Sequence, residues 1–126
     1  MNEYSFSLPY PPSVNHYWRS SKNGVYISKE GRLFREHVRQ VIVNLKLNIH
    51  LTSRLKVTFY VSPPDNRRRD IDNCLKASLD ALSHAGFWLD DCQIDDLRVV
   101  RCEVVKGGGC VVKVRELDGC MKLSDI

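Results

Sequence analysis

Alternating hydrophobic and polar residues mark the strands of this chain. Residues 4–8 and 55–61 alternate with the period of two that is typical of half-buried strands. Both runs end at prolines, at 9–12 and at 63–64, and proline cannot donate a hydrogen bond within a sheet. A shorter apolar run at 24–27 predicts one further short strand.

Two other segments repeat their apolar residues at helical spacing. Ser28 is the expected N-cap of the first helix, whose apolar positions are Phe34, Val38, Val41, Ile42 and Leu45. The second helix is expected to begin at Asp70, with Asp70 or Asp72 capping its free N–H groups, and to end about four turns later at Gly86. Its apolar stripe consists of Leu75, Leu79 and Leu82.

The last third of the chain predicts a β-hairpin. Residues 97–105 are rich in β-branched side chains, the glycines at 107–109 turn the chain, and residues 110–117 return as a strand. Interleaved strands and helices indicate an α+β fold. We expect a single domain over residues 1–126, with a mixed β-sheet, two main helices packed on it and this C-terminal hairpin. The tail, residues 118–126, has no strong pattern and is a candidate for disorder.

Composition agrees with one globular domain and excludes several other classes. The chain has 126 residues, of which 43% are hydrophobic and 27% charged. No run approaches the roughly 18 apolar residues of a membrane span, and residues 1–4 lack the features of a secretory signal. We therefore expect a cytoplasmic protein with no membrane partner. The five cysteines have no CxxC spacing, which favours reduced thiols over disulfides or a zinc site.

Charge is divided unevenly between the two halves of the chain. Residues 1–69 carry 12 lysines and arginines against 4 acidic residues, whereas residues 70–126 carry 7 against 11. The basic half indicates a polyanionic partner such as nucleic acid, and the acidic half would repel that partner unless a divalent metal neutralises it. The alternative is that both sets of charges are ordinary solvated surface.

Segment 67–76 joins three arginines to a pair of carboxylates. Asp70 and Asp72 can point to one side where a loop enters a helix, and oxygen ligands of this kind suit Mg²⁺ or Mn²⁺. Lys76 follows one helical turn later, where it could face a metal-bound phosphate. The alternative is that the carboxylates only cap the helix and that Lys76 is a salt-bridge partner along it. For either aspartate alone, the second interpretation is the better one.

A second acidic cluster follows the apolar anchor 87–89 and consists of Asp90, Asp91, Asp95 and Asp96. If the anchor packs into the core and turns Asp91 toward the start of the second helix, three carboxylates converge and need a cation between them. Calcium-loop and zinc-protease spacings are absent. No nucleophile motif and no nucleotide-binding loop is present either, so we expect no nucleotide cofactor. Metal-assisted phosphodiester hydrolysis is the chemistry that fits.

The segments 63–76 and 86–91 resemble the signatures of the RusA-type crossover junction endodeoxyribonucleases. The combination RRRDxDN…K…GFWLDD is specific, whereas a lone DxD would not be. Residues 8–15, 98–100 and 106–108 also resemble that family in order and spacing, so the likeness covers nearly the whole chain.

This resemblance implies a homodimeric, Mg²⁺-dependent nuclease, with Mn²⁺ able to substitute, that resolves four-way Holliday junctions by paired nicks in DNA recombination and repair. The family is common in prophages. By position, its metal-binding and catalytic carboxylates fall on Asp70, Asp72 and Asp91, and its catalytic lysine on Lys76. Asp90 also matches a family acid, and we give it a supporting role.

The expected DNA-binding residues are Arg67, Arg68, Arg69, Lys76, Asn15 and Arg19. The N-terminal loop departs from the family, which often has another polar residue at Val14 and a second tyrosine at Trp18. The aromatic residues of this loop could stack on unpaired bases or pack in the core. Two rival functions stay open: a branched-DNA-binding protein without enzymatic activity, and a metal nuclease acting on flaps or single strands.

Overall fold

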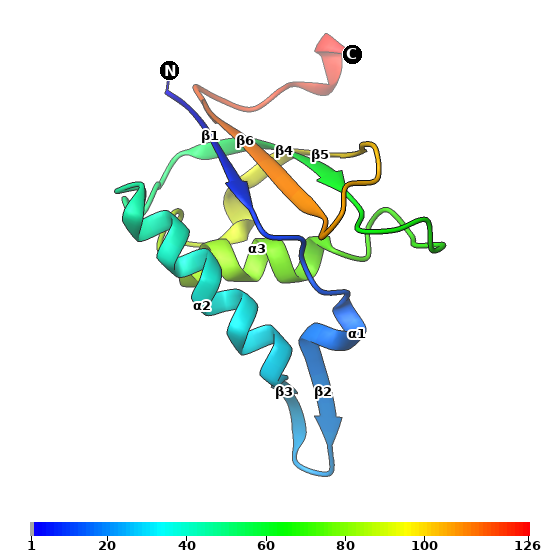
Figure 1. Cartoon of the computed structure of the whole chain (residues 1–126). Helices are drawn as coiled ribbons and strands as arrows, with labels where there is room; N and C mark the ends of the chain where they lie inside the picture. The colour runs from blue at the N-terminus through cyan, green and yellow to red at the C-terminus, as the bar shows by residue number, and fades with distance from the viewer. Residues whose placement is uncertain (1) are drawn as a thin grey trace.

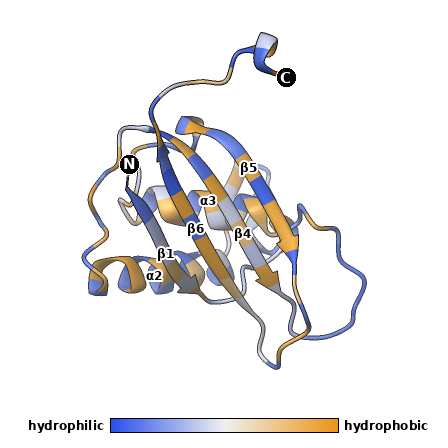
Figure 2. Cartoon of the chain, turned by 90° about the horizontal axis from the view of Figure 1, so that it is seen from above, coloured by the Kyte–Doolittle hydropathy of each residue, from blue (hydrophilic) through white to orange (hydrophobic). Residues whose placement is uncertain are grey.

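The structure, a computed structural model that describes residues 2–126, has the predicted α+β fold. A mixed four-stranded sheet of order β1-β6-β4-β5 forms one layer. The helices α2 (Lys29–Asn44) and α3 (Leu75–His84) lie together on one face of it (Figure 2). The strands are β1 (Glu3–Leu8), β4 (Arg54–Ser62), β5 (Ile94–Arg101) and β6 (Gly109–Leu117).

The core lies between this sheet and the two helices. Alternate residues of the central strands, such as Val57 and Val112, are fully buried against the helices, as the period of two requires. Ile42 of α2 and Leu82 of α3 meet them from the other side with no exposed surface. At 25 cal/mol per Å² of buried apolar surface, each such side chain contributes about 1.5–3 kcal/mol to stability. The sheet and the two helices therefore form a rigid scaffold for the loops that connect them.

The predicted C-terminal hairpin is wrong, because β4 lies between β5 and β6. β5 runs parallel to β4, with α3 as the crossover between them, and β6 runs antiparallel to β4 and β1. After β5 the chain continues along the end of β4, where the N–H of Cys102 donates to the Val61 carbonyl (2.8 Å) and that of Val105 to the Pro63 carbonyl (3.0 Å). The glycine-rich turn then carries the chain across to the other edge of β4.

The beginning of α2 is as predicted, and the beginning of α3 is not. The hydroxyl of Ser28 accepts the N–H of Gly31 at 2.9 Å, which makes Ser28 the N-cap of α2. α3 begins at Leu75, and no side chain caps it. The carbonyls of Asp70 and Asp72 accept backbone N–H groups at 3.2 Å instead, so residues 70–74 form a turn outside the helix. The predicted capping role of these two aspartates is therefore wrong.

The end of α3 follows the prediction and places the acidic segment beyond it. Gly86 has a φ of +80°, which glycine adopts without strain. Its N–H donates to the Ser83 carbonyl (3.1 Å), and the N–H of Phe87 donates to that of Leu82 (3.2 Å). α3 has only 10 residues, fewer than three turns. It is shorter than predicted because its first turn is replaced by the turn at 70–74.

A two-stranded arm extends from the body of the molecule (Figure 1). It consists of β2 (Trp18–Ser21) and β3 (Gly24–Ile27), and the short helix α1 (Val14–Tyr17) lies at its base. Only β3 was predictable, because β2 and α1 have polar sequences with no period. Two 3₁₀ turns, η1 (Asp91–Gln93) and η2 (Leu123–Asp125), complete the elements of residues 2–126. No helix in this part of the chain is both long and apolar enough to cross a membrane.

Candidate functional site

The carboxylates predicted from the DxD motif lie on the turn that leads into α3. Asp70 and Asp72 are both exposed. The carbonyl of Asn73, in the same turn, accepts the N–H of Val14 at 3.0 Å, which fixes the turn against the start of α1. The turn therefore presents two carboxylates to solvent from an anchored backbone.

The third carboxylate, Asp91, lies at the start of η1. The anchor that precedes it is confirmed for Phe87 and Trp88, which are fully buried, and it is wrong for Leu89, which is 60% exposed. Burial and the neighbouring carboxylate of Asp90 raise the pKa of Asp91, and the ammonium group of Lys76 partly opposes them. Asp91 is therefore a carboxylate whose charge is destabilised in the absence of a cation.

Asp90 supports η1 by capping it. Its carboxylate accepts the N–H of Cys92 at 3.0 Å, and this hydrogen bond lowers the pKa of Asp90. The side-chain oxygen of Gln93 accepts the N–H of Asp90 at 2.9 Å, which completes a capping box. Asp90 thus stabilises the turn on which Asp91 lies, and its supporting role in catalysis stays a prediction.

Lys76 lies in the first turn of α3 and acts electrostatically on Asp91. The alternative, in which it pairs with Asp72 or Asp80 along the helix, is not seen among residues 2–126, where Lys76 forms no salt bridge. The carboxylate of Asp80 accepts instead from Arg35 at 2.8 Å and from the hydroxyl of Tyr17. Lys76 is exposed, so its ammonium group is available to a phosphate.

Asp70 and Asp72 precede the start of α3, whereas Asp91 follows its end and lies on η1, which is tied to the start of β4. The three predicted metal ligands therefore do not meet around one point. Among residues 2–126, no group of three or more aspartate, glutamate, histidine or cysteine side chains is placed to hold a metal ion. The donor set of Asp70, Asp72 and Asp91 consists only of carboxylate oxygens, which is the chemistry that Mg²⁺ prefers. A metal-binding role for these residues stays a prediction.

The last two acids of the cluster do not take part in this arrangement. Asp95 forms an ion pair with Arg54, and that arginine lowers the pKa of Asp95. Asp96 lies beside Lys56 in the register between β5 and β4. Both belong to β5, and the partner of Asp95, Arg54, also donates to the Cys92 carbonyl of η1 at 3.0 Å.

The three arginines of the loop before the turn have different environments. Arg67 is 83% exposed, and its contact with Asp65 is long, at 3.7 Å. Arg68 is also exposed. Arg69 is held inside the loop, paired with Asp65 at 2.7 Å and lying over the ring of Tyr10. Arg67 and Arg68 are therefore free to contact a phosphate backbone, whereas Arg69 mainly shapes the loop.

The N-terminal loop and the arginine loop border a common hollow of about 510 Å³. Ser13 and His16 line it from one side, and Arg68, Asp70 and Asn73 from the other. Asn15 is exposed in α1 beside this hollow, whereas Arg19 lies on the arm, opposite Tyr26. Of the expected DNA-binding residues, the structure thus groups the arginine loop with α1 and places Arg19 apart.

The aromatic residues of the N-terminal loop were expected either to pack in the core or to stack on bases, and they differ in burial. Tyr17 is fully buried and packs against Phe34 and Trp18. Its core role was one of the two predicted alternatives. Tyr10 and Trp18 are half-buried, so each keeps part of its ring accessible.

Gln93 is a site residue that the sequence analysis missed. It is buried, and its side-chain nitrogen donates to the carbonyls of Leu51 and Ser53 at 2.8 Å, which ties η1 to the start of β4. The signal was present, because Asp90 and Gln93 have the spacing of a capping box. The cysteines follow the prediction, since all five are free thiols.

Carboxylates combined with a basic loop on an α+β scaffold are typical of enzymes that cleave phosphodiesters with a metal ion. Comparison with known proteins identifies the family. Residues 9–115 match the family described as Endodeoxyribonuclease RusA. The chain belongs to this family.

Relatives with curated names cover almost the whole chain. The crossover junction endodeoxyribonuclease rusA of Enterobacteria phage HK97 is 52% identical over 118 residues, which are 94% of this chain and 98% of that protein. The proteins of the same name from Shigella sonnei (strain Ss046) and Escherichia coli (strain K12) are 46% and 45% identical over 117 residues, 93% of this chain and 98% of each relative.

Proposed function

We propose that this protein is a Mg²⁺-dependent endonuclease that resolves four-way DNA junctions by paired nicks. It acts as a homodimer in the cytoplasm, in DNA recombination and repair, and is of prophage origin. The observation that carries the proposal is the high identity, over nearly the full length, to proteins named crossover junction endodeoxyribonucleases. The carboxylates of the turn and of η1 and the arginine loop support it, because they suit a divalent cation and a DNA phosphate.

In this proposal Asp70, Asp72 and Asp91 hold the metal. Their oxygen-only donor set fits Mg²⁺, and Mn²⁺ can replace it. When bound, the ion activates the attacking water and stabilises the leaving 3′ oxygen. The raised pKa of Asp91 supports the assignment, because a cation beside this carboxylate would stabilise its charged form against burial and the charge of Asp90.

Lys76 and the arginine loop bind the phosphate. Lys76 stabilises the negative charge that grows on the reacting phosphate, and Arg67 and Arg68 hold the flanking backbone. Arg69 keeps the loop in shape through Asp65 and Tyr10. The basic and acidic halves of the chain thus act on one substrate.

A two-fold dimer suits the substrate. Two symmetry-related copies of the site can each nick one of two opposite strands at a four-way junction. A monomer would have to rebind between the two cuts.

The proposal is tested with a labelled synthetic four-way junction and a linear duplex of matched sequence, each incubated with Mg²⁺ and with EDTA. We expect cutting of the junction only, and only with Mg²⁺. Binding without cutting in Mg²⁺ would favour the non-enzymatic alternative. Equal cutting of a flap or a single strand would favour the second alternative.

A further inference from the structure

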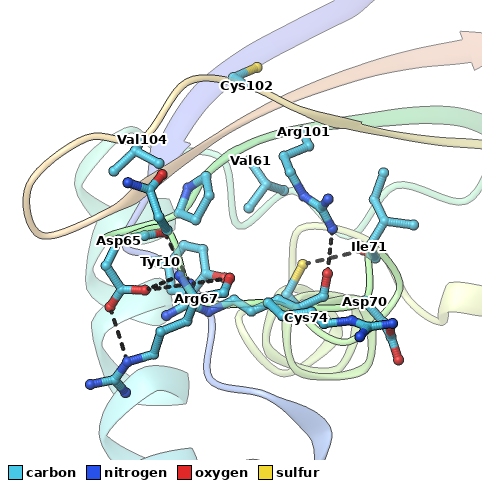
Figure 3. A pocket seen from close by; sticks show the side chains of 14 residues that line it. Tyr10, Val61, Asp65, Arg67, Asp70, Ile71, Cys74, Arg101, Cys102 and Val104 are labelled. Atoms are coloured by element: carbon cyan, nitrogen blue, oxygen red, sulfur yellow. Dashed lines mark hydrogen bonds and ion pairs between the residues drawn. The ribbon is translucent and has the colours of Figure 1, made fainter.

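A second hollow, of about 280 Å³, lies on the inner side of the arginine loop and adjoins the proposed cutting site. Its volume lies at the lower limit of small-molecule sites, about 300 Å³, which is enough for one planar ring system. Val61, Cys102 and Val104 border one side of it, and Asp70 and Cys74 the other (Figure 3). Carboxylate Asp70 thus belongs both to the proposed metal site and to the rim of this hollow.

The lining combines apolar walls with an aromatic and cationic floor. Val61 and Pro63 supply buried apolar surface from the end of β4. The guanidinium group of Arg69 lies 5.8 Å from the centre of the Tyr10 ring, which is a cation–π contact. Flat, polarisable surfaces of this kind bind nucleobases, because every base has a π face.

The loop that forms the hollow is held in place from both ends. Asp65 pairs with Arg69 at 2.7 Å, and Asp65 also accepts the N–H of Arg67 at 3.0 Å. The guanidinium group of Arg101, from the end of β5, donates to the Arg69 carbonyl. A preformed hollow of this kind binds its ligand without an ordering cost.

From this arrangement we infer that the hollow takes up one unstacked nucleobase of the bound junction, next to the phosphate that is cut. The inference rests on the proposed function, since the DNA strand must reach Asp70. It adds a base-binding subsite to the phosphate contacts of Arg67 and Arg68. The occupant is a base and not a phosphate alone, because Val61, Pro63 and Val104 supply apolar wall. Two of the lining arginines are already engaged, Arg69 with Asp65 and Arg101 with the Arg69 carbonyl, which leaves Arg67 and Arg68 for the flanking phosphates.

The experiment measures junction binding in EDTA, where no cutting occurs, with junctions that lack one base at each position near the branch point in turn. Wild-type protein should lose about 10-fold in affinity at one position and little elsewhere, which is the effect of one lost stacking contact. The same junctions are then used with two variants.

The variants Val104→Phe and Val105→Phe form a matched pair. Both valines are 43% exposed, but only Val104 lines the hollow. Val104→Phe should bind the intact junction about 10-fold more weakly and lose nothing further when the base is absent, because the filled hollow no longer holds it. Val105→Phe should behave like wild type. Tyr10→Leu, which removes the ring but stays bulky and apolar, should also lose the sensitivity to the missing base.

A flat profile across all positions would overturn the inference, and so would full sensitivity in both Val104→Phe and Tyr10→Leu. The proposed function is judged separately, by cutting in Mg²⁺. If the protein cuts junctions but its affinity is the same for every position of the missing base, the base subsite is wrong and the nuclease function stands. If affinity falls at one position but no junction is cut in Mg²⁺, the subsite is supported and the nuclease function is wrong.

Discussion

Lys76 is the residue whose role best separates catalysis from structure. Of its two candidate partners along the helix, Asp80 is already paired with Arg35, and Asp72 is exposed and forms no salt bridge with Lys76. An exposed lysine whose charge acts on Asp91 is left. A surface salt bridge would be worth only about 0.3–0.5 kcal/mol. A charge that stabilises the transition state is worth far more.

We therefore expect Lys76→Ala to slow single-turnover cleavage by about 100-fold, equivalent to about 2.7 kcal/mol, at constant junction affinity and melting temperature. Lys76→Arg should rescue poorly, because a planar fork on a longer stem misplaces the charge. Lys29→Ala, at the start of α2, is the control and should cut normally. A Lys76→Ala rate within a few-fold of wild type would contradict the catalytic role.

The carboxylates of the turn and of η1 should behave alike. Asp70→Asn, Asp72→Asn and Asp91→Asn each remove a metal ligand and a negative charge that faces the phosphate. We expect each to abolish cutting and to keep or strengthen junction binding. Asp96→Asn, on β5, is the matched control and should cut at the wild-type rate. Full activity in any of the three would remove that residue from the site.

For single residues, the sequence identifies the candidates for the site better than it identifies the partners that their side chains contact. The motif points to Asp70 and Asp72 because two carboxylates beside three arginines are unusual chemistry. It does not reveal that Arg69 pairs with Asp65 or that Asp80 pairs with Arg35, since each partner is chosen by the packing of separate elements. The contact between Gln93 and Asp90 is different, because the two residues lie only three positions apart and their capping box can be predicted from the sequence alone.

At the scale of elements, one hydrogen-bonded cluster joins α1, α2 and α3. The buried hydroxyl of Tyr17 donates to Asp80, which also accepts from Arg35. Burial and the bond to Asp80 raise the pKa of Tyr17 above its ordinary value of 10.0. Above pH 10 the unfolded chain therefore loses this proton while the folded chain keeps it, and stability falls as the pH rises.

Tyr17→Phe should flatten this alkaline loss, because phenylalanine has no proton to lose. It should also cost about 1 kcal/mol at neutral pH through the lost hydrogen bond. The free energy of unfolding is measured with urea from about pH 8 to pH 11, a range that brackets the ordinary pKa of tyrosine. Tyr26→Phe, on the exposed arm, is the control and should leave the alkaline loss unchanged. An unchanged slope in Tyr17→Phe would mean that other groups cause the loss.

Strands and helices with regularly spaced apolar residues could be predicted, but the order in which they pack against one another could not. β1, β3, β4 and α2 follow from alternation or helical spacing and from the Ser28 cap. The hairpin prediction failed because a glycine turn between two strands looks the same whether they pair or lie on either side of a third. The start of α3 was misplaced because Asp70 and Asp72 are good capping residues that the turn uses differently.

At the scale of the whole molecule, DNA affinity should depend on the exposed arginines. Each phosphate contact contributes about 0.9 to the slope of log affinity against log salt. Arg67 and Arg68 reach solvent, so the double change to alanine should lower the slope by about 1.8. Changing Arg32 and Arg39 of α2, which lie away from the arginine loop, provides the control. An unchanged slope would mean that the loop does not contact the backbone.

The central claim is that Asp70, Asp72 and Asp91 hold one metal site at the start of α3. A crystal grown with Mn²⁺ tests it directly, because the anomalous signal locates the ion without assumptions about the protein. We predict an anomalous peak within about 2.0–2.2 Å of oxygens from these three carboxylates, near the distance for small divalent cations. A peak on other ligands, or none in crystals of protein that cuts junctions with Mn²⁺, would contradict the account.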